Sequence, residues 1–135
     1  MQLTPTIAVH ITAALTALTI GPIAIWMRRG PLQRAKLHRA FGYAWVTCML
    51  ITAISSVFIR DYQMPNIYGY TLIHMFVPLT VLGLFRAFRC LHQGDIQGHR
   101  KAMVTMYVAG GLITGAFTLL PNRYLGGLLA QFVAA

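Results

Sequence analysis

The chain is short of charge, and above all of acidic residues. Only 10% of its 135 residues are charged, and two acidic residues stand against eleven Lys and Arg. Soluble domains carry about 25% charged residues, so this chain lacks the charge to cover a surface that faces water. A hydrophobic content of 57% also excludes a disordered chain, which needs low hydrophobicity and high charge. The composition therefore predicts a protein of the lipid bilayer.

The shortage of acids leaves a formal net charge of +9. On a soluble fold such a charge would suit nucleic acid, but this chain is too apolar to present it in that way, so we expect no nucleic-acid partner. Its length allows one domain, and we expect residues 1–135 to form it. Cysteine is scarce as well: Cys48 lies in the middle of one predicted helix and Cys90 at the inner end of another, and this difference in depth excludes a disulfide and a Cys-x-x-Cys site.

Long uncharged stretches divide the chain into four pieces of membrane length. They cover residues 1–27, 40–59, 62–85 and 102–122. About 20 apolar residues of helix cross a bilayer, and lipid forces the backbone to satisfy its own hydrogen bonds. We therefore expect an all-α membrane protein, an antiparallel up-down-up-down four-helix transmembrane bundle. Its helices are predicted near residues 5–27, 38–59, 67–89 and 100–120.

The basic residues predict the orientation of these helices. Two connections hold nine of the eleven: Arg28, Arg29, Arg34, Lys36, Arg39, Arg86, Arg89, Arg100 and Lys101. The positive-inside rule places both connections in the cytoplasm and both termini outside. The first helix lacks a basic leader and is too long for a signal peptide, so we expect it in the mature protein.

An apolar tail, residues 121–135, follows the fourth predicted helix. It is too short to cross the bilayer. The sequence leaves two locations open for it. The tail could lie along the interface on the outer side of the membrane, or pack on a second copy of the chain, which would make the protein a homodimer.

Four of the five histidines repeat in position along the two halves of the chain. His10 and His74 lie 64 residues apart, each near the outer end of a predicted helix. His38 and His99 lie 61 residues apart, and each precedes an arginine at the inner start of the next helix. The chain therefore resembles two similar helix hairpins in tandem. A lone histidine at a helix end often places its ring among lipid headgroups, but this arrangement favours pairs.

The pairs would face each other across the bundle. Alternate helices of an up-down-up-down bundle are diagonal, so His10 faces His74 and His38 faces His99. Two imidazoles across a diagonal leave room for one iron with both axial positions filled, and for a flat macrocycle between the helices. The sequence thus predicts two haem b groups with irons roughly 20 Å apart. Both would be non-covalent, because no Cys-x-x-Cys-His motif is present.

Cations lie beside both predicted sites, where the anionic propionates of haem need them. Arg39, Arg100 and Lys101 accompany the inner pair, and Arg60 and Arg123 accompany the outer pair. Zinc fits less well, because it takes three or four protein ligands and each pair offers two.

Three stretches carry a family resemblance. Residues 37–43 (LHRAFGY), 94–103 (GDIQGHRKAM) and 117–123 (FTLLPNR) resemble a bacterial family of predicted membrane proteins, labelled domain of unknown function 2306. The resemblance implies four helices in the inner membrane and no particular activity. In architecture the chain also resembles the cytochrome b561 class, whose members hold two haems by histidine pairs and pass electrons across the bilayer.

We therefore predict a small di-haem b-type cytochrome of the bacterial inner membrane, with both termini periplasmic. As an oxidoreductase it would carry electrons across or within the membrane, between a quinone and an unknown redox partner at one face. Residues 60–62 would offer a docking point outside. Two other functions stay open: binding or transport of a transition metal or of haem itself, and a structural subunit without a cofactor.

Overall fold

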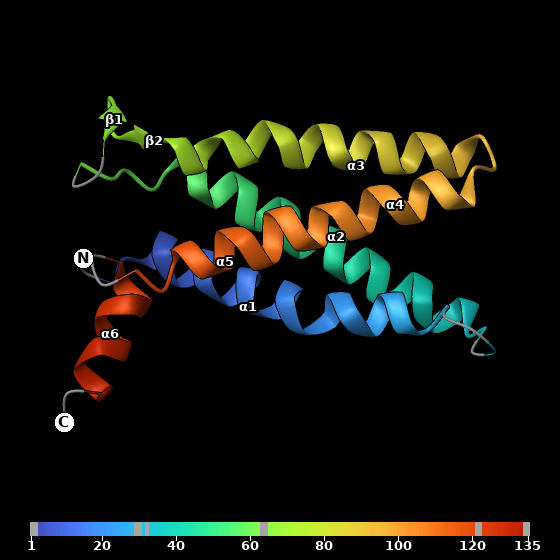
Figure 1. Cartoon of the computed structure of the whole chain (residues 1–135), viewed down its shortest axis with the longest axis horizontal. Helices are drawn as coiled ribbons and strands as arrows, with labels where there is room; N and C mark the ends of the chain where they lie inside the picture. Colours follow the sequence, from blue (N-terminus) through green and yellow to red (C-terminus); the bar gives the residue numbers. More distant parts are fainter. Residues whose placement is uncertain (1–2, 29–30, 32, 63–64, 121–122, 134–135) are drawn as a thin grey trace.

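The computed structural model describes residues 3–28, 31, 33–62, 65–120 and 123–133 and is built almost wholly of helix. Figure 1 shows the long helices running side by side. In chain order the elements are α1 (Pro5–Trp26), α2 (Ala35–Val57), β1 (Asn66–Ile67), β2 (Tyr70–Thr71), η1 (Leu72–Met75), α3 (Phe76–His92), α4 (Ile96–Met106), η2 (Tyr107–Ile113), α5 (Thr114–Phe117) and α6 (Tyr124–Val133).

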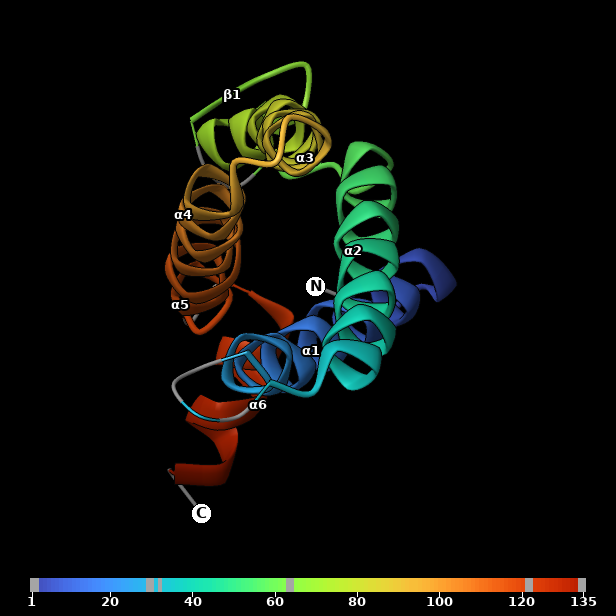
Figure 2. The same ribbon diagram turned by 90° about the vertical axis from the view of Figure 1, so that its right-hand side faces the viewer.

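Three helical stretches are long and apolar enough to cross a membrane: Pro5–Trp26, Ala35–Val57 and Leu72–His92. The fourth predicted helix is present as α4, η2 and α5, which follow one another without a break but with a π-helical stretch, η2, in the middle. Viewed end-on, α1, α2, α3 and α4 follow one another around a ring, with α1 opposite α3 and α2 opposite α4 (Figure 2).

The two ends of the molecule differ in charge. Both termini and the β1–β2 hairpin lie at one end, the hairpin end, and the connections α1–α2 and α3–α4 lie at the other (Figure 1). We call the latter the basic end, because its described residues include Arg28, Arg34, Lys36, Arg39, Arg89, Arg100 and Lys101. Arg29, which the sequence analysis also assigned to this side, lies outside the described residues.

The hairpin shifts the third predicted helix. We expected that helix from residue 67, but residues 66–71 pair as two short antiparallel strands and helix begins only at Leu72. Tyr68 and Gly69 make the turn with φ values of 54° and 82°, the conformation that two-residue hairpins need. Asn66 stabilises it, because its side-chain oxygen accepts the Gly69 N–H at 2.9 Å.

Small residues bring the helices close together. Ala17 of α1 and Ala87 of α3 lie in the core, where a larger side chain would hold the backbones apart. Gly21 is tighter still: a Cβ there would lie 2.7 Å from the Tyr107 ring and 2.9 Å from the Trp45 indole nitrogen. Many large apolar side chains elsewhere are exposed, as expected of helices that face lipid.

One polar contact joins the first and last long helices. Pro22 inside α1 has no N–H, so the Leu18 carbonyl four residues earlier loses its helical donor. The Tyr107 hydroxyl, at the start of η2, donates to that carbonyl at 3.1 Å. In lipid no water is present to replace this donor, so the contact compensates for the proline.

Replacing Tyr107 by phenylalanine should therefore destabilise the protein. The substitution keeps the ring and leaves the Leu18 carbonyl unpartnered, which costs about 1 kcal/mol of unfolding free energy in a membrane protein. Denaturant unfolding in mixed micelles measures the loss, and the exposed Tyr43 supplies the control, Tyr43→Phe. If the two variants were equally stable, the hydrogen bond from Tyr107 to Leu18 would not stabilise the protein.

Candidate functional site

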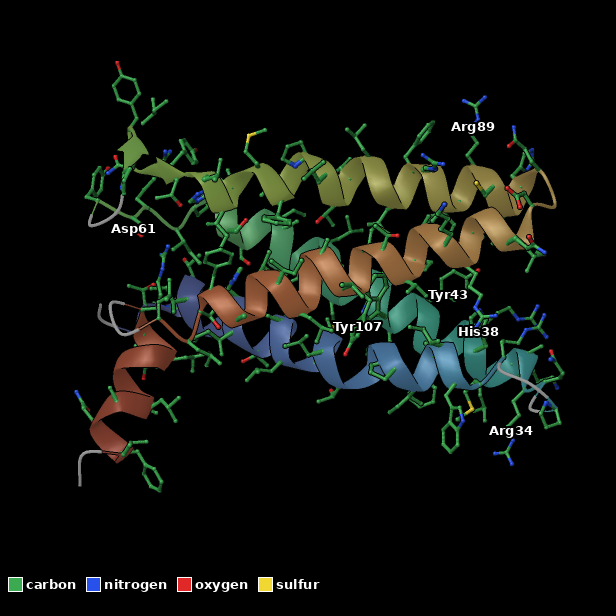
Figure 3. All side chains as sticks on the ribbon, viewed as in Figure 1. Arg34, His38, Tyr43, Asp61, Arg89 and Tyr107 are labelled. Carbon is green, nitrogen blue, oxygen red and sulfur yellow. The ribbon has the colours of Figure 1, made fainter. Side chains whose placement is uncertain are left out.

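His38 and His99 open into one cavity. Its volume is about 600 Å³, within the range of small-molecule and cofactor sites. Residues from α1, α2, α3 and α4 line it, so it lies inside the ring of helices at the basic end. Figure 3 shows His38 near this end and Tyr107 farther along the helices. The structure thus brings together the inner pair of histidines that the sequence predicts.

Each of these histidines is oriented by a backbone carbonyl of the neighbouring helix. Nδ1 of His38 lies 2.8 Å from the Ala24 oxygen, and Nδ1 of His99 lies 2.9 Å from the Ala87 oxygen. A carbonyl only accepts, so Nδ1 carries the proton in both rings, and Nε2 of the neutral imidazole keeps its lone pair. Neither Nε2 has a hydrogen-bond partner among the described residues. Metal-ligating histidines adopt this arrangement, in which a hydrogen bond at one ring nitrogen orients the other nitrogen toward the metal.

The two hydrogen bonds are equivalent in the two helix pairs. In α1–α2, His38 binds a carbonyl 14 residues earlier in the chain. In α3–α4, His99 binds a carbonyl 12 residues earlier. In both, the ring at the start of the second helix binds a carbonyl near the end of the first. The sequence repeat therefore corresponds to a repeated side-chain arrangement at the basic end.

The cavity combines apolar walls with a cationic rim. Phe88 and Leu91 of α3 belong to its apolar wall. Gly42 leaves space, because a Cβ added there would meet no atom within 4 Å. Three arginines, Arg28, Arg39 and Arg100, line the cavity and are exposed; Lys101, which the sequence also predicted, is not among the lining residues. Such a site suits a largely apolar molecule that carries anionic groups.

A haem with two axial histidines meets these conditions. His38 and His99 offer one unprotonated nitrogen each from opposite helices, the wall is apolar and the arginines lie where propionates need cations. Sequence reasoning missed Arg28 and Tyr107 as lining residues. Tyr107 had a signal: Pro22 frees a carbonyl for which some distant donor was needed.

His10, at the hairpin end, has one free ring nitrogen. Its Nδ1 lies 3.1 Å from the Thr52 carbonyl oxygen and 3.0 Å from the Ser55 hydroxyl. Its Nε2 has no hydrogen-bond partner among the described residues.

His74 uses both ring nitrogens within the chain. Nε2 donates to the Ile59 carbonyl at 3.0 Å, and Nδ1 accepts the Thr71 backbone N–H at 3.1 Å. The edge of the ring also packs against Tyr70, with the ring centres 5.1 Å apart. In this arrangement no nitrogen of His74 is available to a metal, so the outer pair does not fit a bis-histidine haem.

The two cations predicted for the outer site also have protein partners. The Arg60 guanidinium lies 3.6 Å from the centre of the Tyr70 ring and donates to the Tyr68 carbonyl at 3.1 Å. Arg123 forms an ion pair with Asp61 at 2.8 Å, and both side chains are largely buried. Asp61 is the middle residue of the docking loop that the sequence predicted at residues 60–62. Because Asp61 is buried, its side chain is not exposed to a partner.

Other metal sites find no support in the described part of the chain, where no three His, Cys, Asp or Glu side chains gather. Comparison with known proteins gives one match. A family model described as "Predicted membrane protein (DUF2306)" matches residues 7–130. No curated protein and no solved structure matches the chain.

Proposed function

We propose that the chain, which belongs to the DUF2306 family of predicted membrane proteins, is a b-type cytochrome that carries single electrons in the membrane. One observation carries the proposal. Two histidines from opposite helices open into one apolar cavity, each with Nδ1 bound to a carbonyl and Nε2 unpartnered among the described residues.

The residues around the cavity have distinct tasks in this proposal. The Ala24 and Ala87 carbonyls fix the two imidazoles with Nε2 turned toward the cofactor. The rim arginines bind its carboxylates, and the apolar wall excludes water from its faces. Bound haem would supply reversible one-electron chemistry, and His38 and His99 would hold its iron.

The same proposal includes four transmembrane helices. The 22 residues from Ile96 to Phe117 are continuously helical and therefore roughly 30 Å long, which matches the hydrocarbon core of a bilayer. With the three candidate spans they would make an antiparallel bundle of two helix pairs. The positive-inside rule then places the basic end in the cytoplasm of a bacterium and both termini in the periplasm.

The surface supports a view of the partners. Arg34 and Arg89 point away from the helices at the basic end (Figure 3). With the other cations there they would attract an anionic redox partner. The second partner would be a quinone from the bilayer. On α6, Phe132 is 83% exposed, so lipid or a second copy of the chain would cover this helix.

The sequence also predicts a second haem between His10 and His74. For that haem to bind, His74 would have to give up its hydrogen bond to Ile59 or to Thr71, because a ring nitrogen needs a free lone pair to bind iron. The inner site requires no such change.

An absorption spectrum tests the proposed function. The full chain, purified from membranes, should show a Soret band, and dithionite should produce the sharp α band of a low-spin b-type haem. Haem should be present in stoichiometric amounts and should not exchange with added apomyoglobin. A colourless protein with a bound transition metal, or haem that exchanges readily, would favour transport of the metal or the haem instead.

A further inference from the structure

We infer that His74 fastens the β1–β2 hairpin to the end of α2, and that the hairpin end therefore holds no haem, so that each chain binds one. The count of one rests on the proposed function. The fastening role does not, because it follows from hydrogen bonds within the chain.

The contacts of His74 reach both sides of the hairpin. Through Nδ1 it accepts the backbone N–H of Thr71, the last residue of β2, and the Thr71 hydroxyl lies 3.3 Å from the same nitrogen. Through Nε2–H it donates to Ile59, which lies two residues beyond α2. One imidazole thus joins the end of the hairpin to the segment that leads into it, and both bonds need the neutral Nε2–H tautomer.

Other contacts at the hairpin end hold the same two segments together. The Asp61 N–H donates to the Gly69 carbonyl at 2.9 Å, and Arg60 stacks on Tyr70. Arg123, which precedes α6, joins its own segment to these two through an ion pair with Asp61. His74 of η1 therefore belongs to a polar cluster in which the predicted haem-binding side chains of His74, Arg60 and Arg123 each already have a protein partner.

The repeat of the sequence shows where His74 departs from its counterpart. His10 binds the carbonyl of Thr52, 42 residues later, on the helix that follows. The same offset from His74 leads to Ala116 in α5, but its ring binds Ile59 and Thr71 instead. The second histidine thus turns from the following helix toward the preceding loop. In the predicted pair, Nε2 of His74 carries a proton and donates it to the Ile59 carbonyl, whereas iron would need a lone pair on that nitrogen.

Hydrogen exchange of the full chain in nanodiscs tests the fastening. His74→Ala should speed exchange of the Thr71 and Asp61 amides about tenfold, because the hairpin then opens locally. His74→Asn restores an acceptor near Nδ1 and His74→Gln restores a donor near Nε2, so each should recover part of the protection. His92→Ala, at the exposed end of α3, is the control and should change neither amide.

Haem content of the same variants tests the count. Wild type and all three His74 variants should bind one haem per chain by the pyridine haemochrome assay. Two haems in wild type and one in His74→Gln would overturn the inference and leave the proposed function standing. No haem in wild type would overturn the proposed function and the count with it, while the exchange measurement would still test the fastening. Unchanged exchange in His74→Ala would overturn the fastening.

Discussion

His38→Ala or His99→Ala should empty the haem site. Each substitution removes one of the two nitrogens that face the cavity and leaves the other ring bound to its carbonyl. Loss of an outer-shell partner alone lowers metal affinity about 10- to 100-fold, so loss of an axial ligand should lower it at least as far. Purified variants should hold less than about a tenth of the wild-type haem and lack the reduced α band.

His92→Ala is the matched control for these variants. His92 is exposed at the end of α3 and does not line the cavity, so its replacement should leave the spectrum unchanged. Exogenous imidazole should restore part of the α band in His38→Ala, since it can occupy the space that the side chain leaves. Full haem content with a low-spin spectrum in either alanine variant would show that its histidine is not a ligand.

Gly42→Phe should block the cavity without removing a histidine. Gly42 lines the cavity, and a Cβ added at this position meets nothing within 4 Å. A phenyl ring at residue 42 would therefore occupy the cavity. The backbone tolerates the change, because Gly42 lies inside α2, where phenylalanine is a better helix former than glycine. We expect haem content to fall at least about tenfold while far-ultraviolet circular dichroism keeps the helical signal.

Gly42→Ala is the control that removes the glycine without filling the cavity. The alanine methyl group fits the open space, so this variant should keep its haem and gain slightly in helix stability. Normal haem content in Gly42→Phe would mean that the cofactor lies elsewhere. Unfolding of Gly42→Ala would mean that this position needs glycine for the backbone, and neither result is expected.

The sequence predicted those parts of the fold that depend on hydrophobic length. α1 and α2 lie within three residues of their predicted bounds, and the third span ends at His92 where residue 89 was expected. Membrane thickness fixes such lengths, so uncharged stretches measure them well. The hairpin at residues 66–71 was missed, because Tyr68 takes up a positive φ that its residue type does not signal.

The candidate site was predictable only as far as spacing determines it. His38 and His99 share a cavity because the repeat gives them equivalent places at one end of the helices. His10 and His74 have a similar spacing, 64 residues against 61, but spacing says nothing of side-chain partners. The tight turn at Tyr68 and Gly69 returns the chain so that Ile59 lies within reach of His74. Local loop geometry, which no helical period encodes, thus decides which nitrogens stay free.

The bond between Tyr107 and Leu18 has a consequence for how the protein is made. The two residues are 89 positions apart, so the ribosome adds Tyr107 about 4–18 s after Leu18 at about 5–20 residues per second. Throughout that interval the Leu18 carbonyl of the first helix lacks the Tyr107 donor, and this group needs water or another temporary donor. The newly made first helix should therefore stay near the translocon, and settle among its neighbours only when the last long helix arrives.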